Sequence, residues 1–346
     1  MSAPASQLVV TLGEGNTPLV ESVTCAQLFF KLENYNPTGS YKDRFIATQM
    51  TRMLRLGSKA CVATSAGNTG SALAAYCARY RVRCAILVNH DTPAVKLAQM
   101  QAHGARVIRI PEFANNPAVT LSVFETLRAF SRERQVPLVL SAFRYCPEGM
   151  LGVQQISREI AARITPDHVF VPVGGGGLYS AVVQGFQEGE GPVPRVHTVQ
   201  PEGCLTVVAS FLRGDNVIRA VNSTTAIGAL SVPFDIDGSR ALARLRECDG
   251  RGIAVSDYEI FAAQRRLLEQ EGIDCEPAGA AALAGWLRAR QEGLVADGET
   301  SVCLVTGHAF KDPASVETAA RKHPDVTVSA PQVGGILDGL LTRRDA

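Results

Sequence analysis

The chain has 346 residues, enough for one large or two medium domains, and its composition is 46% hydrophobic and 19% charged, which is typical of a soluble globular protein. The 34 Lys and Arg residues nearly balance the 33 Asp and Glu residues, so no basic field points to nucleic acid or to an anionic membrane as a partner. No apolar stretch is long enough to cross a membrane and no secretory signal pattern is present, so we expect a cytoplasmic protein.

Short β-rich runs alternate along the chain with longer segments that have the 3.6-residue period of a helix. The expected strands, in chain order, are 28–33, 60–64, 84–88, 106–110, 137–141, 168–173, 195–200 and 301–306. The expected helices between them include 68–80, 92–103, 117–133, 151–163 and 256–271. This alternation predicts an α/β fold with mainly parallel sheets that are covered by helices on both faces.

Ligands of such sheets bind beyond the carboxyl ends of the strands, where loops lead into helices. The first such loop, NPTG at 36–39, precedes Ser40, which we interpret as an N-cap with Asp43 as its capping-box partner. Lys42 then lies in the first turn of a helix, where the helix dipole disfavours a cation. This position favours the neutral amine, the form that attacks an aldehyde. The alternative is a solvated surface lysine that tolerates a poor position.

The second loop, TSAGNTG at 64–70, follows the expected strand 60–64 and opens a helix. Amides at a helix start, together with the side chains of Ser65, Asn68 and Thr69, can cradle a carboxylate or a phosphate. Asn68 can also hydrogen-bond an oxygen of a flat cofactor. The alternative is an ordinary N-cap in which Ser65 or Asn68 satisfies the first amides. We favour a ligand site, because one cap does not require so many small polar residues.

Four consecutive glycines form the third loop, between an apolar strand and a helical pattern: Gly174, Gly175, Gly176 and Gly177. Without side chains, their amides can close on a phosphate at a helix N-terminus. A dinucleotide-binding fold also uses a glycine loop between a strand and a helix, with an acid after the next strand, here Glu202. That motif requires a glycine at position 179, where the chain has Tyr179. We therefore disfavour an NAD-dependent oxidoreductase.

The fourth loop follows the strand 301–306, which ends at Thr306. A hydroxyl group there can bond a pyridine nitrogen without protonating it fully, whereas an aspartate would make the ring a stronger electron sink. His308, two residues further, is more often structural than catalytic in such a place, so we assign it no role.

Nine cysteines are scattered along the chain, and none forms a Cys-x-x-Cys pair. Their odd number and irregular spacing disfavour both a disulfide framework and a zinc site. We expect buried free thiols and no metal.

Together the four loops resemble those of the fold-type II pyridoxal-phosphate enzymes and, among these, most closely those of threonine synthase. The resemblance extends from about Gly13 to Pro313 in the motifs GEGNTPL, KLE-x-x-NPTGSYKDR, SAGNTG, EPAGAAALAG and VTGHAFKDP, which occur in the order typical of the family. It implies two three-layer αβα domains with the cofactor in the cleft between them. A large cofactor-binding domain would comprise residues 1–45 and 146–346, and a small mobile domain residues 46–145. It also implies a homodimer.

The resemblance implies a role for each loop. Lys42 would be the catalytic residue and would hold pyridoxal 5′-phosphate as a Schiff base. The four glycines would bind the cofactor's phosphate, Asn68 its phenolic oxygen and Thr306 its ring nitrogen, while Ser65, Asn68 and Thr69 would receive the substrate carboxylate. The implied activity is that of a lyase which eliminates or replaces a group on an amino acid. Threonine synthase chemistry, which converts O-phospho-L-homoserine and water into L-threonine and phosphate, is the specific expectation.

Several positions depart from the threonine synthase pattern. Cys146 and Leu151 stand where that family has an arginine, suited to the substrate phosphate, and a lysine. Arg144, two positions earlier, is the remaining candidate for the phosphate. The glycine loop and EPAGAAAL look more like the motifs of serine or threonine dehydratases, so a dehydratase or a specialised β- or γ-replacement enzyme is the alternative. Ala66, which cannot move a proton, argues against racemisation. A cofactor-binding protein without catalytic activity also remains open.

Overall fold

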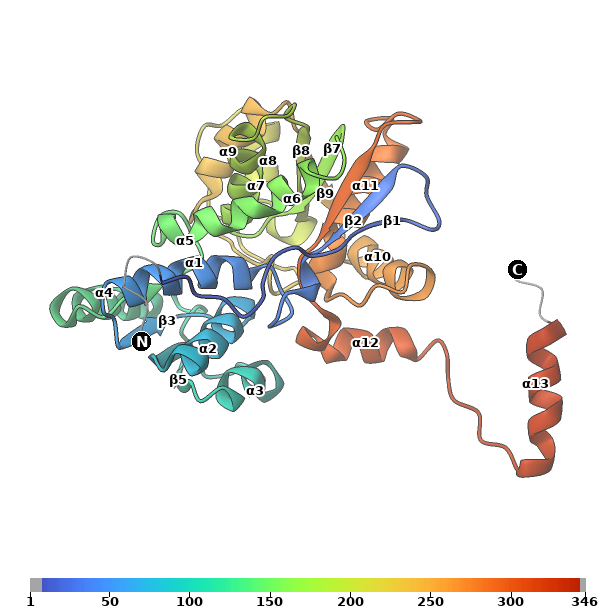
Figure 1. The fold of residues 1–346 in the computed structure, drawn as a ribbon, viewed down its shortest axis with the longest axis horizontal. Helices are drawn as coiled ribbons and strands as arrows, with labels where there is room; N and C mark the ends of the chain where they lie inside the picture. The colour runs from blue at the N-terminus through green and yellow to red at the C-terminus, as the bar shows by residue number, and fades with distance from the viewer. Residues whose placement is uncertain (1–7, 343–346) are drawn as a thin grey trace.

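The computed structural model describes residues 8–342, and Figure 1 shows their arrangement. The strands are β1 (Leu19–Glu21), β2 (Leu28–Leu32), β3 (Ala60–Ala63), β4 (Arg83–Asn89), β5 (Arg106–Ile110), β6 (Leu138–Val139), β7 (His168–Pro172), β8 (Arg195–Pro201), β9 (Gly252–Val255) and β10 (Ser301–Val305). The helices are α1 (Lys42–Arg55), α2 (Asn68–Tyr80), α3 (Ala94–Ala102), α4 (Pro117–Arg134), α5 (Pro147–Leu151), α6 (Gln155–Ala161), α7 (Gly177–Gln187), α8 (Val207–Leu212), α9 (Gly238–Glu247), α10 (Asp257–Gln270), α11 (Pro277–Gln291), α12 (Pro313–Ala320) and α13 (Val333–Thr342).

The first sheet has six strands in the order β1-β2-β10-β7-β8-β9, and only the β1–β2 pair is antiparallel. Its inner strands β2, β10, β7 and β8 are buried on both faces, as expected for a mainly parallel sheet. In β10, Val302 and Leu304 belong to the core under α7, whereas Cys303 and Val305 belong to the core under α10 and α11. This two-residue alternation separates the two apolar layers and produces a three-layer αβα unit.

The second sheet has four parallel strands in the order β5-β4-β3-β6. It is built from residues between 60 and 139. Ile86 and Val88 of β4 pack with Leu97 and Met100 of α3 and with α2, which cover one face of the sheet. The predicted α/β class with two helix-covered, mainly parallel sheets is confirmed.

Most of the predicted elements are present, and the differences have local causes. The strand expected at 137–141 is reduced to β6, and the short edge strands β1 and β9 were not predicted because three or four residues carry too little periodicity. The helix predicted at 151–163 is wrong as a single element. It is divided into α5, a 3₁₀ turn (Gly152–Gln154) and α6. A Cβ on Gly152 would clash with Thr48 and with the Arg44 carbonyl of α1, so the tight packing against α1 is where the helix changes geometry.

Beyond α12 the chain follows an irregular path to α13, which lies apart from the two sheets in Figure 1. No helix within residues 8–342 is both long enough and apolar enough to cross a membrane.

Candidate active site

Lys42 is the first residue of α1, and Tyr41 is the N-cap of that helix. An isolated antiparallel bridge joins Ser40 to Gly307, and the Tyr41 amide donates to the Thr306 carbonyl at 3.2 Å. The start of α1 is therefore fixed against the carboxyl end of β10. This arrangement brings Lys42 and the buried Thr306 to the same edge of the first sheet.

The predicted capping box between Ser40 and Asp43 is wrong. The Ser40 hydroxyl accepts a long hydrogen bond from the Lys42 amide at 3.4 Å, and the Asp43 carboxylate instead accepts from the amide and the hydroxyl of Thr38, at 3.2 and 2.8 Å. The bridge to Gly307 pulls Ser40 out of the helix, so α1 begins later than the local pattern indicates.

The Lys42 amine contacts a side chain that comes from the second sheet. Lys42 Nζ donates to Ser141 Oγ at 2.6 Å, and Ser141 Oγ lies 3.0 Å from Thr69 Oγ1. Ser141 follows β6, and Thr69 lies in the first turn of α2. A continuous hydrogen-bonded path thus connects the lysine amine with the loop that carries Ser65, Asn68 and Thr69.

That loop is not an ordinary N-cap, so this alternative is wrong. Gly67 is the N-cap of α2, and no side chain caps the helix. Ser65 Oγ accepts from the Gly67 amide at 3.4 Å, while Asn68 Nδ2 donates to Glu276 Oε1 at 2.7 Å. Among the described residues, no hydrogen bond uses the second hydrogen of the Asn68 amide group or its carbonyl oxygen, so both can serve a ligand.

The glycine loop lies between β7 and α7, as predicted. Gly176 has a φ of +93° and is the N-cap of α7, a conformation that side chains rarely allow. Among the residues that the structure describes, the backbone amides of Gly174, Gly175, Gly176 and Gly177 donate to no group. Consecutive amides without partners at a helix N-terminus suit a phosphate. By this test the loop fits the phosphate of pyridoxal phosphate.

Asp237 joins the glycine loop to the segment after β6. Its amide donates to the Gly175 carbonyl at 2.9 Å, and its carboxylate accepts from the amides of Phe143 and Arg144, at 2.7 and 3.1 Å. Burial raises the pKa of Asp237, and the two amide hydrogen bonds oppose that change. This connection holds the segment that carries Ser141 close to the glycine loop.

Two buried carboxyl groups, Asp43 and Glu276, and the half-buried Lys311 lie behind the Lys42 and Asn68 loops. Burial raises the pKa of Asp43 to about 6, against the hydrogen bonds from Thr38, and burial raises the pKa of Glu276, against the hydrogen bond from Asn68. Burial lowers the pKa of Lys311 to about 8, against the charges of Glu276 and Asp43. The two carboxyl groups and the lysine therefore lie in a poorly solvated place, and each of the three pKa shifts favours the neutral form of its side chain.

The structure does not bring the Arg144 side chain into this group. The side chain is exposed, with its guanidinium 6.0 Å from the ring of Tyr145. Cys146 is buried, with Sγ 3.6 Å from the Leu138 carbonyl, and Leu151 is exposed. Neither position where the resemblance leads us to expect a cation holds one.

Ser141, Glu276 and Asp237 are site residues that the sequence reasoning missed. A weak signal existed for the first two. Ser141 ends an expected strand, where ligand-binding side chains are typical, and Glu276 opens the quoted motif EPAGAAALAG. Asp237 lies between recognised motifs and carried no signal.

The comparisons with known proteins agree with this geometry. Residues 10–307 match the family described as pyridoxal-phosphate dependent enzyme. The chain is 34% identical over 329 residues to the threonine synthase of Methanosarcina acetivorans, which covers 90% of this chain and 79% of that protein. It is 33% identical over 321 residues to the threonine synthase of Methanocaldococcus jannaschii, covering 88% and 77%.

A solved structure shares the fold. The serine racemase of maize superposes with a TM-score of 0.75 at 22% identity, covering 89% of this chain and 92% of that one. The family match includes the lysine, asparagine and glycine loops and ends at Gly307. The nicotinamide alternative is therefore wrong. The chain belongs to the pyridoxal-phosphate-dependent enzymes and, by its curated relatives, to the threonine synthase branch of that family.

Proposed function

We propose that this enzyme converts O-phospho-L-homoserine and water into L-threonine and phosphate. The observation that carries the proposal is the hydrogen-bonded path from Lys42 Nζ through Ser141 to Thr69. This path joins Lys42, the first residue of α1, to the loop at the start of α2 that is suited to a substrate carboxylate. The identity to threonine synthases over most of the chain supports the choice of reaction.

The residues that would hold the cofactor come from four loops. Lys42 Nζ would bind its aldehyde carbon, and the free amides of Gly174, Gly175, Gly176 and Gly177 its phosphate. Asn68 would donate to its phenolic oxygen, and the Thr306 hydroxyl would bond its ring nitrogen. When bound, pyridoxal phosphate delocalises the negative charge that remains on the substrate after a proton has been removed.

The chain's own groups would then position the substrate and move protons. Ser65, Asn68 and Thr69 would bind the substrate carboxylate and so place its α-carbon near Lys42. Lys42 Nζ would take the α-proton as general base, which requires the neutral amine. Ser141 Oγ, within 2.6 Å of Nζ and 3.0 Å of Thr69, orients the amine and can pass a proton along this path.

The substrate phosphate needs positive charge, which Cys146 and Leu151 do not supply. Arg144 would reach it only by turning its exposed side chain toward Ser141. Lys96 of α3 is a second candidate. Its Nζ lies 3.7 Å from the position that a Cβ on Gly228 would occupy, and its positive charge acts to lower the pKa of Glu276. Either cation would form a charge-assisted hydrogen bond with the phosphate.

The quaternary and dynamic features belong to the same proposal. Residues 46–145, which include the whole second sheet, would move as a small domain toward the domain formed by residues 1–45 and 146–346, and so exclude water. Two chains would form a homodimer. A cytoplasmic location is consistent with nine free cysteines, since thiols persist in a reducing compartment.

The test is phosphate release from O-phospho-L-homoserine, with the organic product identified by mass spectrometry. We expect one phosphate for each L-threonine formed. The buried Cys146 and exposed Leu151 favour a second candidate, a threonine dehydratase, which would give 2-oxobutanoate and ammonia from L-threonine. Absence of phosphate release, with 2-oxobutanoate formed from L-threonine, would replace the first proposal with the second.

A further inference from the structure

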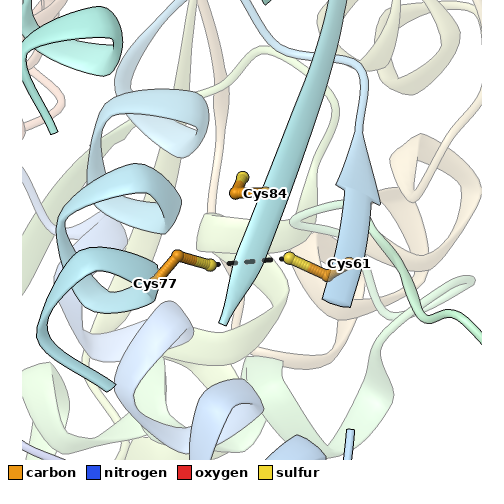
Figure 2. Close-up of side chains that lie close together, drawn as sticks. All are labelled: Cys61, Cys77 and Cys84. Atoms are coloured by element: carbon orange, nitrogen blue, oxygen red, sulfur yellow. Dashed lines mark hydrogen bonds between the residues drawn. The ribbon is translucent and has the colours of Figure 1, made fainter. Parts of the chain in front are cut away.

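Three cysteines that are far apart in the sequence meet within the second sheet unit (Figure 2). Cys61 lies on β3, Cys84 on the neighbouring β4, and Cys77 near the end of α2. Cys61 and Cys84 are directly paired in the parallel register of the two strands. Their side chains therefore leave the same face of the sheet, the face that α2 covers.

The spacing of the three sulfur atoms suits a single metal ion. All three Sγ atoms lie within 4.8 Å of one another, and those of Cys61 and Cys77, which point toward each other in Figure 2, are 3.5 Å apart. With a metal–sulfur distance of about 2.3 Å, tetrahedral geometry places sulfur atoms about 3.8 Å apart. The 3.5 Å between Cys61 and Cys77 is close to this value, and the 4.8 Å limit on the other two separations includes it.

A cavity lies beside the cysteine cluster. It has a volume of about 290 Å³, and its wall includes Cys77, Cys84, Arg81, Arg83 and His103. Cys77 and Cys84 both belong to the cavity wall, and Cys84 is half-buried whereas Cys61 and Cys77 are buried. Three thiolates around a divalent ion carry a net negative charge, and two arginines in the wall offset it.

The thiolate is the form of cysteine that binds a metal, so an ion that binds at the three sulfur atoms displaces their protons.

We propose that Cys61, Cys77 and Cys84 bind one thiophilic d¹⁰ metal ion of the zinc class, with its fourth position open toward the cavity. Soft thiolate ligands select such ions over magnesium or calcium. The ion would connect β3, β4 and α2. Cys61 lies four residues before Ser65 on the same strand-to-loop segment, so the ion would stabilise the unit that presents the candidate substrate loop. This site is independent of the proposed reaction.

The test uses the full chain with its cofactor, reduced and freed of metal, and titrated with Cd(II) and Zn(II). Thiolate-to-cadmium absorption in the ultraviolet and elemental analysis after gel filtration count the bound ions. We expect one ion per chain and a higher melting temperature. In Cys84→Ser and Cys77→Ala the affinity should fall by at least about a hundredfold, since even the loss of a group that only hydrogen-bonds to a metal ligand costs about 10- to 100-fold. Cys25→Ser, which removes another half-buried thiol, should bind as the unchanged chain does.

Several outcomes would overturn the site. These are no bound ion in the reduced protein, thiols that only form a Cys61–Cys77 disulfide on oxidation, or binding that Cys84→Ser leaves unchanged. Loss of a buried cysteine can impair folding. Because Cys84 is only half-buried, its serine variant should stay folded and so test the site by itself. Circular dichroism verifies that each variant is folded.

Discussion

Replacing Ser141 by alanine tests the core of the proposed mechanism. The Ser141 hydroxyl is the atom between Lys42 Nζ, at 2.6 Å, and Thr69 Oγ1, at 3.0 Å. Alanine removes both hydrogen bonds and leaves the backbone of the segment unchanged. The Lys42 amine then loses its partner from the second sheet, and the path to the carboxylate-binding loop is interrupted.

The size of the effect follows from the hydrogen bonds that are lost. A hydrogen bond to a charged or ionisable group contributes about 1.5–3 kcal/mol. If that contribution is made in the transition state, kcat/KM falls by roughly 10- to 150-fold. Because Ser141 is half-buried rather than part of an apolar core, the free energy of unfolding should fall by no more than about 1 kcal/mol.

The assay is steady-state phosphate release by Ser141→Ala, together with urea unfolding. Ser157→Ala is the matched control, because Ser157 is buried and donates to the Val182 carbonyl at 2.6 Å, away from the lysine. It should lose about 1 kcal/mol of stability and keep its kcat/KM. A loss of kcat/KM below about threefold in Ser141→Ala, with the variant folded, would refute the role that we give to this path.

Three further predictions concern the cofactor, the glycine loop and stability. Lys42→Ala should abolish the visible absorption band of the cofactor-bound protein, and a band that persists would show that another group holds the cofactor. Gly176→Ala should lower the free energy of unfolding, measured in urea, by about 1–3 kcal/mol. Gly176 has a φ of +93°, and a Cβ there would lie 2.6 Å from a backbone carbonyl oxygen. Gly191→Ala is the control, because a Cβ on Gly191 meets no atom within 4 Å. Burial lowers the pKa of His197 to about 3 and also lowers that of His168. The stability that these neutral histidines contribute is therefore present above the unfolded-state pKa of about 6.5 and is lost as the pH falls below that value. For His197 the loss at pH 5 is about 2 kcal/mol. Equal unfolding free energies at pH 7.5 and 5, or the same loss in His197→Gln, would contradict this.

The sequence allowed the loops to be found because each is a local pattern. A strand, a run of small or polar residues and a helix start lie within about fifteen residues of one another for Lys42, Asn68 and the glycines. Their meeting at one edge was also predictable, since the carboxyl ends of parallel strands share an edge. The family motifs then indicated the cofactor.

The missing parts all depend on long-range contacts. Ser141 lies 99 residues from Lys42, and Glu276 lies 208 residues from Asn68, so no window of sequence contains either pair. The capping box at Ser40 failed for the same reason, because a bridge to Gly307 overrides the local preference. The three cysteines required both the strand register and the helix position, which their sequence spacing does not reveal.

The contacts between the two sheets differ in kind on the two sides of the site, and this difference supports the proposed closing motion. On one side a single apolar core includes Ala63 of β3 and Val171 of β7, so the two sheet units share buried surface there. On the other side the connections are polar. Gln99 of α3 accepts from Lys311 Nζ at 2.6 Å and donates to the Thr38 carbonyl at 3.3 Å.

Each of these polar contacts has a net worth of only about 1 kcal/mol when water can replace the partner, and somewhat more where a charge takes part. Separating the apolar core would expose far more surface, at about 25 cal/mol for each Å². The shared apolar core is therefore suited to act as the hinge. The polar contacts of Asn68 and Gln99 lie on the side where the cleft between the two units would open. Substrate that binds between Lys42 and the 64–70 loop would add contacts only in the closed arrangement, and such differential contacts are what shifts an equilibrium between two states.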